Sequence, residues 1–346
     1  MESVKEATKK IEVLQAGRAI AAMLVVGYHT NQAINSFIGK SSQGGRLFLE
    51  YGYLGVDFFF VLSGFIIYFS VLRKKEFELP SYLLQRLNRI FTPYLPVGIL
   101  MALLYTLMPS VSEGDRSWGW FTTLTLLPAE DRPALNVAWT LRHEVVFYFV
   151  FGLLFYFRKL WIGFALWAAA IFAYECSLDP GNQSGILGQL FGSINIEFLF
   201  GLLVAKFYLE NKKPNYLLCF LLMFGAFTLW VIFGAIVDQS WLVGLSLAAG
   251  VYVLIDLEMK GRVQIPKFLS VLGNGSYSIY LVHPIAVSIA VRIAHKFFGG
   301  SEGVAFLFVF LTSITVGMVY YVLIEKPVVN YLRLKLSSRL VKLASQ

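Results

Sequence analysis

Ten apolar segments, each about as long as a lipid bilayer is thick, restrict this chain to a membrane-spanning fold. A helix needs roughly 20 predominantly apolar residues to cross the hydrocarbon core. Hydrophobic side chains make up 57% of the 346 residues and charged side chains only 14%, whereas soluble proteins carry about 25% charged residues. We therefore expect an all-α, polytopic integral membrane protein with about ten transmembrane helices. These are predicted at residues 13–35, 51–72, 90–109, 137–157, 160–176, 187–206, 215–234, 239–256, 272–294 and 304–324.

The distribution of basic residues sets the orientation of these helices. Cytoplasmic loops of membrane proteins carry an excess of Lys and Arg. With the N-terminus in the cytoplasm, all but seven of the 29 Lys and Arg residues fall at or near the inner face. The exceptions are Lys40, Arg46, Arg116, Arg132, Arg142, Arg292 and Lys296. Both termini are therefore predicted to be cytoplasmic, and the net charge of +8 needs no nucleic-acid partner to explain it.

The chain divides into a transmembrane domain at residues 1–327 and a basic tail at residues 328–346. The tail alternates Lys and Arg with Leu and Val, a pattern typical of an amphipathic helix lying on a membrane surface. We expect it on the inner leaflet, with a frayed soluble end as the alternative. No clear internal repeat is visible, which argues against a transporter built from inverted repeats.

Two ionisable residues interrupt the first apolar segment. Arg18 and His29 are 11 residues apart, which on a helix is three turns plus about 20°, so both lie on one face about 16 Å apart along the axis. Ionisable residues inside a span indicate a functional site by default. The competing explanation is a polar contact that holds two helices together.

The predicted topology brings further polar residues to the depth of His29. Asp57 and Glu144 fall with His29 in the outer third of the bilayer, and Glu197 lies about halfway through its helix. A histidine beside a carboxylate is a common arrangement for a general base with a fixed tautomer. His29, Asp57 and Glu144 are therefore candidate catalytic residues, and Glu197 is a candidate substrate-binding residue. A capping or helix-pairing role would also explain either Asp57 or Glu144 alone.

A second polar layer is predicted on the cytoplasmic side. Arg86 and Arg89 are spaced i, i+3 and share one helix face. Two arginines so placed can hold phosphate oxygens through charge-assisted hydrogen bonds, although ordinary anchoring at the inner face explains them as well. His283, directly before Pro284, is expected deep in the bilayer. It is a candidate for binding the acyl donor, for supporting a buried polar cluster, or for plain packing.

The largest outer loop, at residues 110–136, carries Trp118 and Trp120. Either indole could stack on a sugar ring, so both are candidate substrate-binding residues. The alternative is an interfacial belt, where membrane proteins concentrate Trp and Tyr.

Six stretches spread over nearly the whole chain carry a family resemblance. They are Arg18-x10-His29, GVDFFFVLSGF at 55–65, RLNRIFTPY with Arg86 and Arg89, AWTLRHEVVFY at 138–148, SYSIYLVHP at 276–284 and Glu325-Lys326-Pro327. Together, and in this order, they resemble the membrane-bound acyltransferase 3 family, bacterial enzymes that acylate extracytoplasmic glycans. One departure is QAGRA at 15–19, where the family commonly has a leucine-arginine-glycine start.

The resemblance implies a donor, a location and roles for several residues. It implies ten helices in the bacterial inner membrane and acetyl-CoA as the cytoplasmic donor, with no metal. It implies an essential role for His29, support of donor binding by Arg18, and contact of Arg86 and Arg89 with the CoA end. The acceptor it implies is a cell-surface glycan or a lipid-linked saccharide, as for the exopolysaccharide and O-antigen O-acetyltransferases.

Two neighbouring positions refine the resemblance. Glu144 matches the glutamate of the family's fourth helix. Arg142 and His143 resemble the exopolysaccharide branch, and Arg142 is taken as a candidate substrate-binding residue.

These observations combine into one predicted reaction, with two alternatives. Acetyl-CoA would dock with its phosphates on Arg86 and Arg89, and its thioester would reach His29, which acts as a base or takes the acetyl group itself. A transporter or lipid flippase would use the same buried charges to bind a moving substrate. An acyltransferase with another donor, such as succinyl-CoA, or with a lipid or antibiotic acceptor is the third possibility.

Overall fold

The protein is predominantly helical in the part of the chain that the computed structural model describes. That part comprises residues 11–39, 47–74, 76–108, 117–177, 185–233, 240–298 and 301–332. The structure is 85% helical. The described residues form no strand, only an isolated bridge between Trp118 and Arg132. The predicted all-α fold is confirmed.

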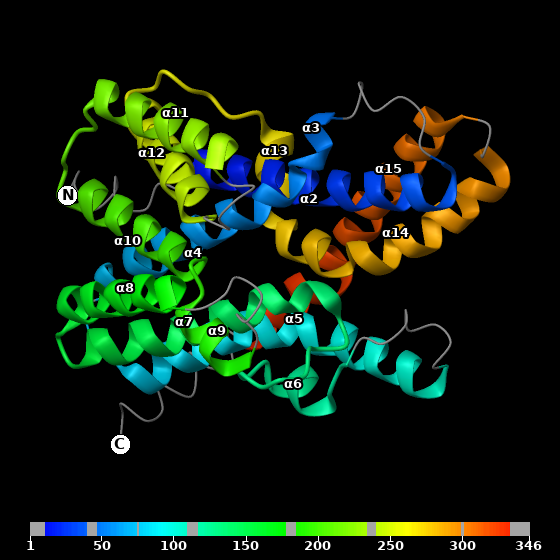
Figure 1. The fold of residues 1–346 in the computed structure, drawn as a ribbon, viewed down its shortest axis with the longest axis horizontal. Helices are drawn as coiled ribbons and strands as arrows, with labels where there is room; N and C mark the ends of the chain where they lie inside the picture. Colours follow the sequence, from blue (N-terminus) through cyan, green and yellow to red (C-terminus); the bar gives the residue numbers. More distant parts are fainter. Residues whose placement is uncertain are drawn as a thin grey trace.

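Ten long helices form the body of the described structure (Figure 1). They are α2 (Glu12–Phe37), α4 (Gly55–Leu72), α5 (Leu79–Leu107), α7 (Trp139–Tyr156), α8 (Leu160–Ser177), α10 (Asn195–Leu209), α11 (Tyr216–Phe233), α12 (Ser240–Met259), α14 (Ser276–Phe298) and α15 (Glu302–Tyr320). Shorter helical elements connect them, namely α3 (Leu47–Glu50), η2 (Gly52–Leu54), α6 (Trp120–Thr125), η4 (Asn136–Ala138), α9 (Gly185–Phe191), α13 (Lys267–Asn274) and η6 (Tyr321–Glu325).

Nine helices of the described ranges are long and apolar enough to cross a membrane. Each predicted span except the first coincides with one of them, so the polytopic membrane protein is confirmed. The first predicted span coincides with α2, which has 26 residues but carries polar side chains such as Arg18 and His29. The orientation of the termini stays a prediction. Of the predicted tail, residues 328–332 continue the last helix, and residues 333–346 lie outside the described residues.

The third long helix begins 11 residues earlier than predicted. α5 starts at Leu79, with Pro80 in its first turn, where a proline costs no hydrogen bond. It also continues through Pro93 and Pro96. Neighbouring helices contact this stretch of backbone, since Tyr277 Oη donates to the Ile90 carbonyl at 3.0 Å and Tyr320 Oη donates to the Pro93 carbonyl at 2.7 Å. Arg86 and Arg89 therefore lie inside a helix that runs on into the bundle.

The ninth predicted span is two helices. α13 ends at Asn274 and α14 begins at Ser276, with Gly275 between them. Gly273 allows α13 to cross the start of α2, because a Cβ there would collide with the Gln15 carbonyl. α14 then runs beside α2 (Figure 1). This arrangement brings two helices more than 200 residues apart in sequence into one polar site.

Glycines also bring α4 and α10 into backbone contact. A Cβ on Gly64 would collide with the Phe198 carbonyl, and one on Gly201 would collide with the Val61 carbonyl. Small residues at such crossings allow close approach, which is a main source of helix association in membranes.

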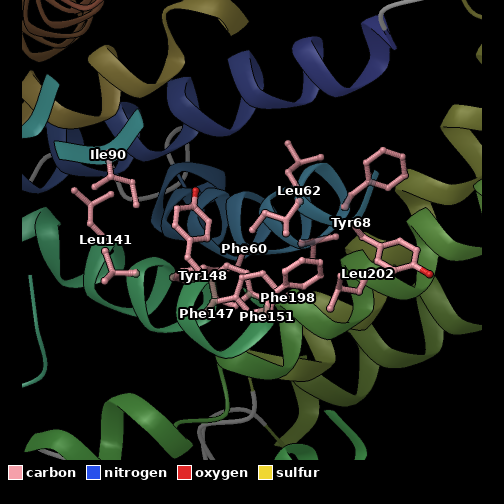
Figure 2. Packing of buried hydrophobic residues seen from close by; sticks show 14 of the residues in the cluster. Phe60, Leu62, Tyr68, Ile90, Leu141, Phe147, Tyr148, Phe151, Phe198 and Leu202 are labelled. Carbon is pink, nitrogen blue, oxygen red and sulfur yellow. The ribbon is translucent and has the colours of Figure 1, made fainter. Parts of the chain in front are cut away.

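Aromatic rings from three helices fill the space beside this crossing (Figure 2). Phe147 of α7 stacks on Phe198 of α10 with ring centroids 4.2 Å apart, and Phe151 follows one turn later. Tyr148 belongs to the same helix, and its hydroxyl points away from those rings in Figure 2. One face of α7 is therefore core, and the adjacent face is free to carry polar groups.

The start of α2 is fixed by a residue from another helix. Ile11 precedes the helix and has no side chain that can cap it. The Glu258 carboxylate of α12 instead accepts hydrogen bonds from the backbone N–H groups of Glu12 at 2.8 Å and Val13 at 2.9 Å. A carboxylate at a helix N-terminus satisfies otherwise unpaired donors and complements the helix dipole. The positions of Arg18 and His29 follow from this anchor, because both lie on α2.

Candidate active site

A pocket with a cavity volume of about 80 Å³ opens between α2, α4, α5, α7 and α14. Most of its wall is apolar, with a few converging polar groups. It is lined by Arg18, Val56, Phe59, Phe60, Leu62, Ser63, Ile66, Ile67, Arg86, Arg89, Ile90, Thr140, Leu141, Glu144, Tyr148, Tyr277 and Tyr280.

Three arginines line this pocket, and we refer to them as the arginine group (Arg18, Arg86 and Arg89). Arg18 Nε donates to Ser276 Oγ at 3.0 Å, and Arg86 donates to Ser70 Oγ. Within the described part of the chain, none of the three forms a salt bridge. Three guanidinium groups around one pocket, two of them hydrogen-bonded to neutral hydroxyls, are suited to an anionic ligand.

Glu144 lies in the same pocket, facing the arginine group rather than His29. Its Oε1 accepts hydrogen bonds from Ser63 Oγ at 3.1 Å and Tyr148 Oη at 2.5 Å. It also interacts electrostatically with Arg18. The sequence had grouped this carboxylate with His29 because both were expected at one depth. The difference arises because depth along a helix does not specify which neighbour the side chain faces.

His29 contacts another histidine. Its Nδ1 lies 3.3 Å from Nε2 of His283, and the two ring centroids are 4.9 Å apart. The same Nδ1 lies 3.0 Å from the Val25 carbonyl oxygen. His283 is completely buried, whereas His29 is only partly so. We refer to these two residues as the histidine pair.

Tyr280 connects the pocket to the histidine pair. It lines the pocket, its Oη lies 3.0 Å from Thr140 Oγ1, and its ring centroid is 5.7 Å from that of His283. Phe59 packs edge-on against Tyr280 at 5.9 Å. The histidine pair therefore lies just behind one aromatic wall of the pocket.

Glu325 is a polar residue of this region that the sequence indicated only as part of a motif. It ends the π-helical turn η6 and accepts a hydrogen bond from Ser278. It interacts electrostatically with Arg18 and Arg89. π-helical turns within α-helices are frequent at functional sites, but nothing in the residue types of the segment predicts one.

The remaining candidates lie away from the pocket and do not line it. Asp57 is 5% exposed, near the start of α4. Glu197 is fully buried on α10 against α12, where a Cβ on Gly244 would meet its side chain. Arg142 donates to the Ala129 carbonyl at 2.6 Å.

The two tryptophans lie next to each other. The rings of Trp118 and Trp120 are 5.9 Å apart and edge-to-face, and Trp120 is 39% exposed. The structure brings them into one surface patch but not into the pocket. Among the described residues, no group of three or more His, Cys, Asp or Glu side chains is placed to hold a metal ion.

A helical membrane bundle with a largely apolar pocket, charged at one wall and close to a histidine pair, defines a membrane-embedded ligand site. Residues 11–322 match the acyltransferase domain family Acyl_transf_3, and the chain belongs to this family. It is also similar to the exopolysaccharide production protein ExoZ of Rhizobium meliloti (strain 1021), with 26% identity over 292 residues, 81% of this chain and 90% of the relative. No solved structure matches the chain. The protein is therefore a membrane O-acyltransferase.

Proposed function

We propose that the enzyme transfers an acetyl group from acetyl-CoA to a hydroxyl group of an extracytoplasmic cell-surface glycan or its lipid-linked precursor. The observation that carries this proposal is that α2 contributes a residue to each of two neighbouring sites. Its Arg18 lines the charged pocket, and its His29 lies behind the pocket's aromatic wall. The similarity to a protein named for exopolysaccharide production supports a polysaccharide acceptor.

The donor is assigned from the lining of the pocket. The phosphates of CoA are bound by the arginine group, which has no salt-bridge partner among the described residues. Guanidinium groups bind phosphate oxygens in bidentate geometry. The apolar wall formed by side chains such as Ile66, Ile67 and Leu141 accommodates the uncharged pantetheine arm. Glu144 is assigned to the donor pocket as well, because it lines the same pocket.

The donor and acceptor enter from opposite faces of the membrane. The distribution of Lys and Arg puts both termini in the cytoplasm of the bacterial cell, so the start of α2 near Arg18 faces acetyl-CoA. His29, about 16 Å further along the helix, faces the extracytoplasmic acceptor.

His29 supplies the proton chemistry. It removes the proton from the acceptor hydroxyl as the oxygen attacks the thioester carbon, the carbon–oxygen bond forms, and the carbon–sulfur bond breaks. The departing CoA thiolate then takes the proton from His29. A two-step route through acetyl-His29 uses the same nitrogen first as nucleophile. General base catalysis and positioning next to the thioester both lower the barrier.

Acceptor recognition is assigned to residues outside the pocket. Trp118 and Trp120 form a partly exposed aromatic pair on which a sugar ring stacks, and Arg142 is a buried basic residue of the candidate set. Asp57 and Glu197 are the remaining buried carboxylates of the candidate set. They contribute to acceptor binding.

The test compares envelope glycans from a strain lacking the gene with those from the same strain carrying the wild-type gene or His29→Ala. Mass spectrometry should show an acetyl increment of the glycan only with the wild-type gene. The same membranes, given acetyl-CoA labelled with ¹⁴C in the acetyl group, should transfer label to the glycan fraction. The His29→Ala variant should be present at the same level and lose transfer by at least about 10³-fold.

Three outcomes would contradict the proposal in different ways. A mass increment other than acetyl would change the donor. Label found in a lipid or small molecule rather than in glycan would change the acceptor. Full transfer by His29→Ala would remove the role assigned to His29 while leaving the enzyme class intact.

A further inference from the structure

We propose that His283 is a positioning residue that fixes the tautomer of His29, and that Pro284 sets up this role by freeing a backbone carbonyl for His283. The inference rests on the proposed function, because it takes His29 as the catalytic base. It adds a chain of hydrogen bonds that begins with a proline and ends at the reactive nitrogen of His29.

The series of hydrogen bonds depends first on Pro284. In a helix, the N–H of residue 284 would donate to the carbonyl of residue 280, four positions earlier. Proline has no N–H, so the Tyr280 carbonyl loses its helical partner. His283 fills that vacancy, since its Nδ1 lies 2.6 Å from the Tyr280 oxygen. A carbonyl oxygen can only accept a hydrogen bond, so Nδ1 of His283 carries the hydrogen.

The tautomer of His283 determines its effect on His29. With the hydrogen on Nδ1, Nε2 of the neutral ring presents a lone pair. This Nε2 lies 3.3 Å from Nδ1 of His29, which also lies 3.0 Å from the Val25 carbonyl. Both neighbours of that Nδ1 are therefore acceptors. The hydrogen of His29 is held on Nδ1, and its Nε2 is left unprotonated as the basic atom.

The same contact acts after proton transfer. When Nε2 of His29 takes the proton of the acceptor hydroxyl, the ring becomes a cation with hydrogens on both nitrogens. Its Nδ1–H continues to donate to Val25 and His283, so no group has to rearrange as the charge develops. Preorganised dipoles of this kind stabilise charge that appears in a transition state.

The placement of His283 separates this role from donor binding. His283 is completely buried and does not line the pocket. Its polar contacts are the backbone of its own helix and His29. An effect of His283 on the reaction must therefore pass through its neighbours, which is the property of a positioning residue.

The experiment measures acetyl transfer from ¹⁴C-acetyl-CoA in membranes that contain the native acceptor, for the full-length chain and four variants. Pro284→Ala restores an N–H that competes with His283 for the Tyr280 carbonyl. His283→Leu removes one of the two acceptors for Nδ1–H of His29 and leaves only the Val25 carbonyl, whereas His283→Gln retains an amide oxygen that can accept from Nδ1–H. His295→Gln is the matched control, because His295 is an exposed histidine of the same helix.

We expect the variants of His283 and Pro284 to change kcat and to leave KM for acetyl-CoA unchanged. His283→Leu should lower kcat by about 10²-fold, the low end of a general-base contribution, with KM for acetyl-CoA unchanged. His283→Gln should recover about tenfold of that loss. Pro284→Ala should lower kcat by about tenfold while its thermal midpoint stays equal to or above that of the wild type, because its helix gains a hydrogen bond. His295→Gln should match the wild type.

Several results would overturn the proposal. They are wild-type kcat in Pro284→Ala, a rise in KM alone in His283→Leu, or a His283→Gln variant no better than His283→Leu. If His283→Leu does not fold, Pro284→Ala still decides, since a structural role alone would not lower kcat in a protein that is at least as stable. If the wild type transferred no acetyl group, the proposed function would be contradicted. If the wild type and the His283 and Pro284 variants all transferred it normally, only the positioning role would be contradicted.

Discussion

The arginine group and the histidine pair each have one member on α2, yet their surroundings have little in common. Arg18 faces the pocket, a serine hydroxyl and several charges. His29 faces a second imidazole and a backbone carbonyl. The first environment is suited to hold an anion, and the second to hold a neutral ring in a defined tautomer.

This difference separates binding from chemistry along the axis of α2. A transferase that joins a water-soluble donor to an acceptor across a membrane has to keep the donor's charges away from the reacting carbon. About 16 Å of helix between the two residues provides that separation in a single rigid element. Changes in the arginine group should therefore act on donor affinity, and changes in the histidine pair on turnover.

The largest test of this division is the double variant Arg86→Gln, Arg89→Gln. Each hydrogen bond to a charged group contributes about 1.5–3 kcal/mol, so losing both guanidinium groups should raise KM for acetyl-CoA by about 10²–10⁴-fold. The kcat value at saturating donor should change far less. Initial rates over a range of acetyl-CoA concentrations provide both numbers.

An exposed arginine and a conservative change serve as the controls for that variant. Arg292→Gln removes an exposed arginine that stacks on Phe37 and should leave KM unchanged. Substitution of the same two arginines by Lys should restore only part of the affinity, because an ammonium group lacks the planar fork of a guanidinium. A fall in kcat with constant KM in the double variant would mean that the two regions are not divided as proposed.

Much of the fold could be predicted from the sequence because lipid imposes it. Apolar length alone located nine of the long helices. The boundaries of α5 and α14 differ from the predicted ones. α5 begins at Leu79, ahead of its apolar stretch and with Pro80 in its first turn, and α13 crosses α2 closely at Gly273 before α14 begins at Ser276.

The site could be predicted less completely, for a related reason. Helical spacing placed Arg86 and Arg89 on one face, and both line the pocket with Arg18. The partner of His29 is 254 residues away in sequence, so no local pattern pairs it with His283. The sequence grouped His29 with carboxylates at its own depth, whereas helix packing decides which side chains meet.

Glu144 provides a sharper, smaller test, because sequence and structure place it with different partners. Glu144→Gln retains an oxygen for Ser63 and Tyr148 but removes a negative charge from the pocket. Without that charge the arginine group should hold an anionic donor more strongly, so KM for acetyl-CoA should fall by about threefold at nearly constant kcat. Kinetics with the isosteric variant check this. A kcat loss above about 10²-fold at constant KM would instead assign Glu144 to the chemistry of His29.

The smallest expected effect concerns the anchor that the two regions share. Glu258→Ala removes the carboxylate that accepts from Glu12 and Val13 at the start of α2. Loss of an N-terminal cap costs about 0.5–2 kcal/mol, which in a protein of this size lowers Tm by a few degrees, roughly 2–4 °C per kcal/mol. Because the anchor positions α2 as one rigid rod, KM and kcat should shift together and only slightly. Thermal unfolding in detergent measures the change in Tm, and initial-rate kinetics measure KM and kcat.

Glu210→Ala, which removes only an exposed carboxylate beside Lys212, is the control and should leave Tm unchanged. A change confined to KM or to kcat in Glu258→Ala would show that α2 can move at one end alone, and the two regions would then not be rigidly linked.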